Sequence, residues 1–241
     1  MARPIGKQEA RVPALVRAVR KALRDAADPE KAAGMRAYMK STMPYRGVTA
    51  PVLRKAVKAI FAAHPLEIWE EWRDAVLELW RGAKYREERY AAIELAGYPR
   101  YRQFQTLETI ALYEELITSG AWWDYVDAIA SHRIGGLLRR YPAEMSALLR
   151  EWAQCDDLWK RRSAILSQLG FKHETDRKLL YDAILPSAGS TEFFLRKGIG
   201  WALRQYAWSE PKEVIRFVRQ NQRLLSPLTR REALKNVAPA G

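Results

Sequence analysis

Two tryptophans and two aspartates fall within the eight residues GAWWDYVD, at positions 120–127. Trp123 and Asp127 are four residues apart, so they share one face if the stretch opens a helix, because about 3.6 residues make a turn. An indole face attracts cations, and a carboxylate beside it can stabilise positive charge or orient a water for attack. The stretch therefore predicts either a site for a cationic group or only a helix start with a bulky anchor.

The elements that must position these residues have the apolar pattern of helices. Apolar residues recur at helical spacing along most of the chain, and no segment keeps a period of two. Two of the predicted buried stripes are Ile68, Trp72, Val76, Leu79 and Trp80, and Val52, Ala56, Ala59 and Ile60. Predicted helix starts are the prolines at 13, 29, 51, 65, 142, 211 and 227 and the polar residues Ser119, Asp157, Ser190 and Ser226. This pattern predicts an all-α protein of roughly a dozen helices, each about 11 to 20 residues long.

A weak internal repeat appears when four similar stretches are aligned on Arg89, Asp124, Arg162 and Lys197. The intervals are 35, 38 and 35 residues, and each holds two predicted helices. Stacked helix pairs of this length are typical of HEAT and armadillo solenoids. We therefore expect a single domain over residues 1–241, folded as a right-handed αα superhelix of about six helix pairs.

The repeat alignment places four chemically useful side chains on one surface. Relative to the anchors, Trp123 is at −1, Asp127 at +3, Arg162 at 0 and Trp201 at +4. At about 100° per residue, these positions point in similar directions and lie within about 7.5 Å along the helix axes. We expect them to form one cluster, although each tryptophan alone fits a core role, Asp127 alone fits a helix dipole and Arg162 alone fits a solvated charge.

Two indoles, a carboxylate and an arginine together suit a nucleotide with a positively charged base. The indoles attract the cation, the arginine can hold a phosphate with two parallel hydrogen bonds, and the carboxylate opposes the charge that develops on the sugar. N3- and N7-alkylated purines carry such a charge, and the same charge makes them good leaving groups. The predicted chemistry is hydrolysis of their glycosidic bond.

The composition points to a polyanionic partner. The chain has 41 Lys and Arg against 28 Asp and Glu, a formal net charge of +13 and a pI near 9.9. Such an excess favours nucleic acid, because each phosphate that is neutralised releases counterions. A basic protein without a special partner is the alternative.

Several other classes are disfavoured by the sequence. The single cysteine, Cys155, excludes an internal disulfide and fits a reducing compartment. His64, His132 and His173 lack the spacing of a zinc site, and no glycine-rich phosphate loop occurs. Neither a signal peptide nor a membrane-spanning stretch is recognisable, so we expect an intracellular protein with no membrane partner.

Six longer stretches resemble the DNA alkylation repair (AlkD-like) family of HEAT-like-repeat DNA glycosylases, over roughly residues 10–237. They are MRAYMKSTMPYRGV, LWRGAKYREERYAAIEL, SGAWWDYVDAIA, DLWKRRSAILSQLGFK, EFFLRKGIGWALRQYAW and LSPLTRREALKN. The resemblance implies cleavage of N3- and N7-alkylated purines from duplex DNA, without metal or organic cofactor, leaving an abasic site. It also implies a monomeric, cytoplasmic, bacterial protein that meets DNA at the nucleoid. An open solenoid need not extrude the base, so we expect the lesion to be read at the duplex surface.

By resemblance, the site residues of the family fall on Trp123, Asp127, Trp201, Arg162 and Tyr38. Tyr38 rests on the resemblance alone. Two departures from the family pattern are Gln205, where glutamate is expected, and Arg161, which precedes Arg162 and could take its contact with phosphate. The alternative function is a non-catalytic helical-repeat module that binds nucleic acid or protein.

Overall fold

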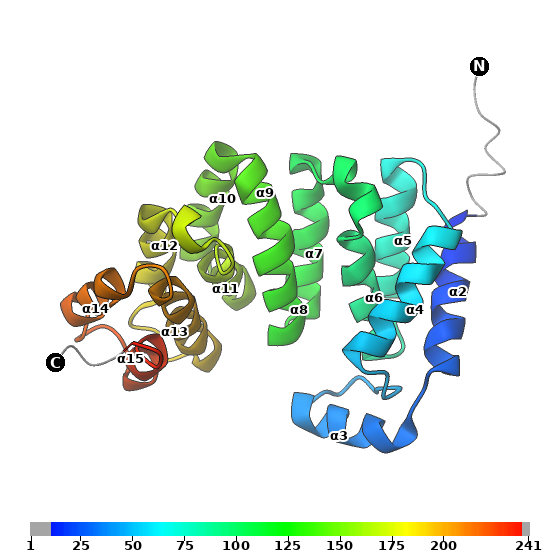
Figure 1. Ribbon diagram of the computed structural model, residues 1–241, viewed down its shortest axis with the longest axis horizontal. Coiled ribbons are helices and arrows are strands. Elements are labelled where there is room, and N and C mark those ends of the chain that lie inside the picture. Colours follow the sequence, from blue (N-terminus) through cyan, green and yellow to red (C-terminus); the bar gives the residue numbers. More distant parts are fainter. Residues whose placement is uncertain (1–10, 238–241) are drawn as a thin grey trace. The chain divides into compact units, whose positions relative to one another are not determined.

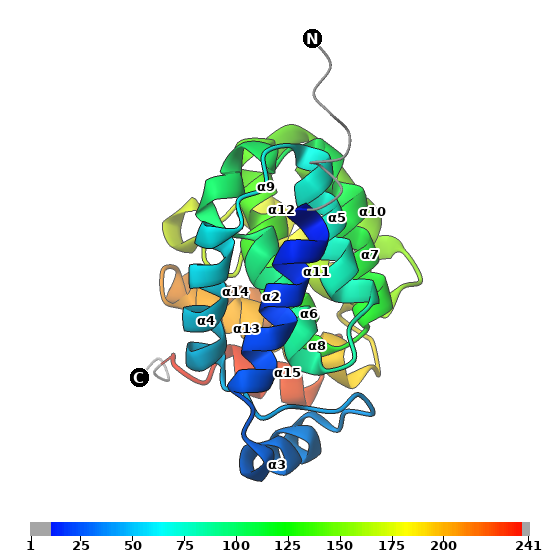
Figure 2. The same cartoon turned by 90° about the vertical axis from the view of Figure 1, so that its right-hand side faces the viewer.

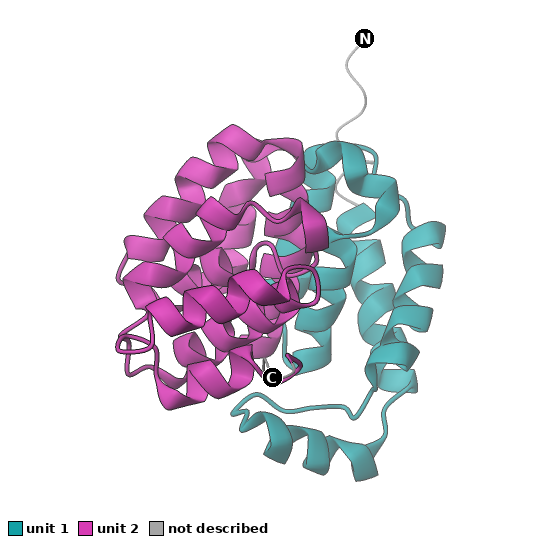
Figure 3. Ribbon diagram, turned by 60° about the vertical axis from the view of Figure 1, so that its left-hand side comes forward, with its two compact units in different colours: residues 1–105 teal, residues 106–241 magenta. Residues whose placement is uncertain are grey.

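The computed structural model describes residues 11–237, and all regular structure in that range is helical. This confirms the predicted all-α fold, and the succession of paired helices is compatible with a helical-repeat superhelix. The chain divides into two compact units, residues 1–105 and 106–241 (Figure 3). The predictions of a single domain and of a right-handed superhelix with about six helix pairs concern both units together, so they stay predictions.

Unit 1 is built around α2 and α5. Helix α2 packs on α4 and α5, and α5 packs on α6 (Figures 1 and 2). On α5, Trp72, Val76, Leu79 and Trp80 are at most 1% exposed, which confirms the predicted stripe for these four residues. Ile68 instead caps the start of this helix. The elements are α2 (Arg11–Asp25), α3 (Pro29–Met39), α4 (Ala50–Ala63), α5 (Trp69–Arg81), α6 (Arg86–Ala96) and η1 (Pro99–Phe104).

The predicted stripe on α4 was wrong by one residue. Leu53, Val57 and Phe61 are buried, whereas Val52 is 47% exposed. Val52, Ala56 and Ile60 of the predicted stripe repeat every four residues, as the buried set does, so spacing alone does not separate them. The structure buries the set that removes more apolar surface from water, because Leu53 and Phe61 are larger than the alanines of the other stripe.

Unit 2 contains the stretch with the two tryptophans. A continuous core joins α11 to α15 and includes Leu180, Ile199 and Phe217. Helix α11 packs on both α8 and α13, so side chains from these three helices can meet. The elements are η2 (Leu107–Thr109), α7 (Ile110–Gly120), α8 (Trp123–Ala128), η3 (Ile129–Ile134), α9 (Gly135–Arg140), α10 (Pro142–Gln154), α11 (Leu158–Leu166), η4 (Lys172–Glu174), α12 (Arg177–Ile184), η5 (Leu185–Ser187), α13 (Phe193–Ala207), α14 (Pro211–Gln220) and α15 (Pro227–Ala233).

Helix α8 continues without a break through a π-helical segment into α9. The residues at both joints, Ala128 with Ile129 and Ile134 with Gly135, keep right-handed helical angles. A π segment inside a helix is frequent at functional sites, because the extra residue shifts the register of the side chains that follow. Here it begins two residues after Asp127.

The predicted helix starts were partly right. Prolines 29, 51, 142, 211 and 227 occupy the first turn of their helices, and Asp157 and Ser226 cap theirs through the side chain. Ser119 was wrong, because it lies in the last turn of α7 and donates to the carbonyl of Glu115. Ser190 was also wrong, because α13 is capped at Glu192. Pro65 lies in the link between α4 and α5.

A charged contact fastens α14 to α12 in unit 2. Glu213 accepts hydrogen bonds from Arg216 and, at 2.7 Å, from the hydroxyl of Tyr181, whose ring stacks on Phe217. Arg216 is the main cause that holds the pKa of Glu213 at about 2, and Tyr181 adds to it. A carboxyl with a lowered pKa stabilises the fold above its ordinary pKa and loses that contribution as it is protonated.

We expect Glu213→Gln to lower the free energy of unfolding at pH 6, and the deficit to shrink as the pH falls from about 5 toward 2. The reason is that the carboxylate of the wild type is itself neutralised in this window. Urea unfolding of both proteins between pH 6 and pH 3 measures the difference. A deficit that stays constant with pH would contradict this account.

Candidate active site

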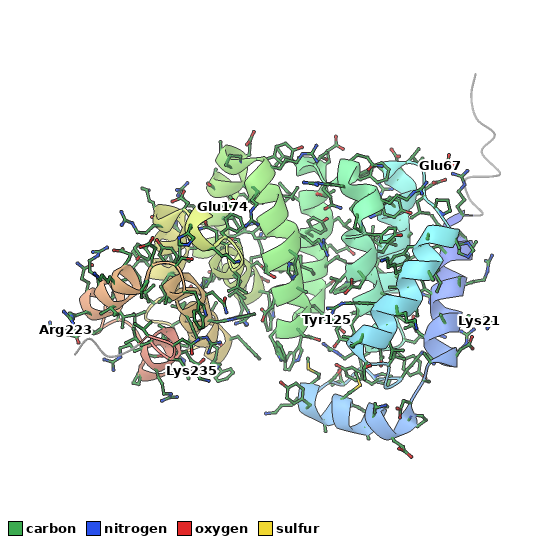
Figure 4. The ribbon with its side chains drawn as sticks, viewed as in Figure 1. Lys21, Glu67, Tyr125, Glu174, Arg223 and Lys235 are labelled. Carbon is green, nitrogen blue, oxygen red and sulfur yellow. The ribbon has the colours of Figure 1, made fainter. Side chains whose placement is uncertain are left out.

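The helix that carries Trp123 and Asp127 begins without side-chain capping. Trp122 is its N-cap residue in an extended conformation, and Trp123 is the first helical residue. Tyr125, which is labelled in Figure 4, and Val126 are fully buried and anchor the helix in unit 2. Asp127 therefore sits one turn after Trp123 on a firmly packed helix, and its residue as a whole is 9% exposed.

Arg162 meets Asp127 from α11 in a buried ion pair. Its Nε donates to Oδ1 at 2.7 Å and its Nη2 donates to Oδ2 at 2.8 Å, so both carboxylate oxygens are held by one guanidinium. Arg162 is 4% exposed. The capping of α11 by Asp157, which accepts from the N–H groups of Trp159 and Lys160, fixes the helix that presents it. Paired, two-point contacts of this kind are strong and orient the carboxylate.

Helix α13 supplies a further hydrogen-bond acceptor for Arg162. The Nη1 group of Arg162 donates to the backbone carbonyl of Phe194. Gly198, one turn further along α13, faces the same guanidinium. Helices α8, α11 and α13 thus contribute a carboxylate, a guanidinium and a carbonyl to one buried contact.

Burial is the main influence on the titration of this site. It raises the pKa of the Asp127 carboxyl above its ordinary value, the pairing with Arg162 acts in the opposite direction, and the charge of Asp124 adds to the rise. A carboxylate that is short of solvent binds a proton more readily than an exposed one. Asp127 is therefore suited to accept a proton from water, or to lie against a positive charge that forms beside it.

The two indoles of the predicted cluster lie on α8, which carries Asp127, and on α13, which supplies the carbonyl. Trp123 is one turn before Asp127, and Trp201 is three residues after Gly198, on the same side of α13. Both are partly exposed, and Trp201 also packs against the core of unit 2. Neither tryptophan is wholly a core residue, so both present indole surface outside the core.

Comparisons with known proteins show the family to which the chain belongs. Residues 19–237 match the family model for DNA alkylation repair enzymes. The chain belongs to the DNA alkylation repair enzyme family. A solved structure described as a predicted DNA alkylation repair enzyme from Enterococcus faecalis is similar to it, with a TM-score of 0.78 and 33% sequence identity, over 89% of this chain and 98% of that one. None of the curated proteins matches. Membership of this family supports a role in the repair of alkylated DNA.

In this member of the family, the structure brings together only part of the predicted set by direct contact. Asp127 and Arg162 are bonded to each other, which the sequence pattern did not predict. The roles assigned to them stay predictions. The guanidinium of Arg162 was expected to meet a phosphate, but its Nε and Nη2 groups donate to Asp127.

The neighbouring Arg161 is placed differently. It is half-buried, and its guanidinium donates to the hydroxyl of Ser187 at 3.1 Å and to the carbonyl of Pro186 at 3.4 Å. It forms no ion pair with a described residue, so its charge is not neutralised by a carboxylate. Tyr38 belongs to unit 1, at the end of α3, and is 77% exposed.

Sequence reasoning missed an aromatic cluster beside the ion pair. The ring of Trp122 lies 5.6 Å from that of Phe194 and 6.4 Å from that of Trp159, and the rings of Trp159 and Phe194 are 5.1 Å apart. Phe194 is the residue whose carbonyl binds Arg162, so the cluster fixes α13 relative to the start of α8. The adjacent tryptophans in WWD could have indicated this cluster. Two bulky neighbours at a helix start cannot both face the same way, so one of them needs separate packing partners.

Metal sites and membrane spans are the remaining features to consider in residues 11–237. No cluster of three or more His, Cys, Asp or Glu side chains there could hold a metal ion. Within the same residues, no helix is both long enough and apolar enough to cross a membrane.

We expect Arg162→Ala to destabilise the protein by about 3 to 5 kcal/mol, because removal of one partner leaves a buried carboxylate without compensation. Arg161→Ala is the matched control from the adjacent position, and it should change stability by less than about 1 kcal/mol. Chemical unfolding at pH 7 gives both values. Equal and small losses for the two variants would show that the ion pair does not hold the three helices together.

Proposed function

We propose that the protein is a monofunctional DNA glycosylase that hydrolyses the N-glycosidic bond of positively charged N3- and N7-alkylated purines in duplex DNA. The reaction would begin base excision repair and leave an abasic site. The observation that carries this proposal is a carboxylate that is buried, oriented at both oxygens by Arg162 and still 9% exposed, in a member of the alkylation repair family.

The proposed reaction breaks the bond between the anomeric carbon of the deoxyribose and the purine nitrogen. The bonding electrons leave with the base, whose positive charge they cancel, so no proton has to be donated to it. The sugar becomes oxocarbenium-like, and the negative charge of Asp127 stabilises it. A water then forms the new bond to the anomeric carbon, and Asp127 accepts its proton.

Arg162 acts in this scheme through Asp127. It keeps both carboxylate oxygens in a fixed orientation, and it favours the charged form against the cost of burial. Arg161, which has no carboxylate partner among the described residues, is then the better candidate of the two for a DNA phosphate. Tyr38 is proposed as a further DNA contact.

Trp123 and Trp201 are proposed to bind the cationic base through their indole faces. Cation–π attraction is lost when the base becomes neutral on departure, so the product is held less tightly than the substrate. This difference in charge would give selectivity for alkylated over normal purines without a base-specific hydrogen bond.

We expect Asp127→Asn to lower the single-turnover rate of base release about 10²- to 10³-fold, since it deletes the charge that opposes the oxocarbenium and keeps an oxygen for Arg162. The measurement is release of N7-methylguanine from a duplex in the presence of a chelator, with DNA affinity and melting temperature recorded alongside. Asp124→Asn, three residues earlier on the same helix, is the control and should retain the rate. An unchanged rate for Asp127→Asn would favour the alternative, a non-catalytic DNA-binding module.

The rate of base release by the wild type should fall on the acid side as Asp127 is protonated. Because burial raises the pKa of this carboxyl, the midpoint of the fall lies above 3.8, the ordinary value. Above that midpoint the rate should stay level through neutral pH, since the departing base takes no proton. Rates corrected for spontaneous depurination test this, and a second fall near neutral pH would require another titrating group.

Trp201→Leu should slow the release of cationic bases about two- to thirtyfold and leave the release of neutral bases nearly unchanged, because leucine keeps apolar bulk and removes the π face. Parallel assays of N7-methylguanine and of a neutral, activated base analogue give the ratio. If both fall equally and the melting temperature drops with them, Trp201 serves the core and not the substrate.

A further inference from the structure

A glycine in the middle of α13 directly faces the guanidinium of the buried ion pair. Gly198 is wholly surrounded by structure, and a Cβ added there would lie 3.0 Å from Nη1 of Arg162, 3.7 Å from Cζ and 3.8 Å from Cγ. All three nearest atoms belong to Arg162. The space that a side chain would fill is therefore the space in which the guanidinium lies.

Glycine is an unfavourable choice for a helix interior, because it has the greatest backbone freedom to lose on folding and alanine is the better helix former. Its backbone here needs no left-handed conformation: in the described chain Gly47 is the glycine with positive φ. Close approach of another group is the remaining physical reason for glycine at this position, and the group that approaches is Arg162.

We infer that Gly198 is a positioning residue, whose missing side chain lets Arg162 reach Asp127 and the carbonyl of Phe194 at the same time. This inference rests on the proposed function for its effect on catalysis, but the contact itself is independent of it. Phe194 and Gly198 are four residues apart and share one face of the helix, so Nη1 reaches the carbonyl directly past the glycine. A methyl group there would push Nη1 away by a few tenths of an ångström.

Nη1 belongs to the same rigid, planar guanidinium as Nε and Nη2. Its displacement therefore tilts the guanidinium plane and moves the two donors that hold Asp127. A misplacement of 1 Å near the reacting groups can cost about 10²-fold in rate. We therefore expect Gly198→Ala to lower the single-turnover rate of base release about tenfold, with DNA affinity unchanged, since no proposed phosphate contact moves.

The chain offers two matched glycine variants. Gly136→Ala also adds a methyl inside a continuous helix of unit 2, where nothing lies within 4 Å, and should retain the wild-type rate. Gly200→Ala places a Cβ 2.5 Å from Cβ of Glu232 on α15, so it should lower the melting temperature without a specific effect on Arg162. Comparison of the three separates a loss of positioning from a general effect of alanine or of poorer packing.

A double-mutant cycle with Arg162→Lys shows whether the glycine acts through the arginine. Lysine has no Nη1 group, so Gly198→Ala should have no further effect on the rate in the Arg162→Lys background. Nitrogen-15 NMR adds a readout that needs no activity, namely the solvent exchange of the Arg162 Nε–H, assigned by its loss in Arg162→Lys. This exchange should become about tenfold faster in Gly198→Ala and remain unchanged in Gly136→Ala.

The outcomes distinguish the inference from the proposed function. If the wild type releases no base, the proposed function fails, and the exchange of the Nε–H still decides the role of Gly198. If the wild type is active and Gly198→Ala matches Gly136→Ala in both rate and exchange, the inference is overturned. A tenfold loss that persists in the Arg162→Lys background would overturn it as well.

Discussion

The buried contact between Asp127 and Arg162 is the constraint to which the surrounding helices must conform. Removing two charges from water is costly, and their attraction offsets that cost only when the geometry is good and the remaining donors find partners. Here α8 brings the carboxylate, α11 brings the guanidinium, and α13 brings the carbonyl of Phe194. A shift of α8 or α11 along its axis would leave a buried charge unpaired, and a shift of α13 would leave Nη1 of Arg162 without its carbonyl acceptor. The ion pair thus specifies how these helices stack, in addition to any chemistry that it performs.

The burial that makes the contact costly is also what makes it chemically useful. An exposed aspartate binds a proton weakly and attracts a cation only through water, whereas burial raises the pKa of Asp127 and strengthens its field. Arg162 limits that rise and keeps the carboxylate oriented. The aromatic rings of Trp122, Trp159 and Phe194 support the arrangement, because they pack the start of α8 against the start of α13.

The sequence could predict the helices and which of them face one another, but not the contact itself. The 38-residue interval from Asp124 to Arg162 correctly associated the helix of Asp127 with that of Arg162, since a repeat places equivalent helices side by side. That the two side chains bond to each other depends on rotamers and on the absence of a side chain at Gly198, neither of which leaves a periodic signal. The prediction of helix starts was wrong where no side chain caps the helix, as at Trp123. It was also wrong where a residue of a capping type lies inside a helix, as Ser119 does. The π segment after Asp127 was invisible, because it differs from an α-helix by a single residue.

The charge of the pair bears on the choice between an enzyme and a binding module. A surface that only binds DNA gains affinity from every unpaired cation and loses it where a carboxylate neutralises one. In a chain with a formal charge of +13, Asp127 nevertheless binds the guanidinium of one arginine. The adjacent Arg161 has no carboxylate partner within residues 11–237. Phosphate affinity alone would favour the opposite arrangement at position 127, a neutral or basic residue. A carboxylate there fits the proposed function, in which an alkylated purine and the oxocarbenium that it leaves behind provide a positive charge to be stabilised.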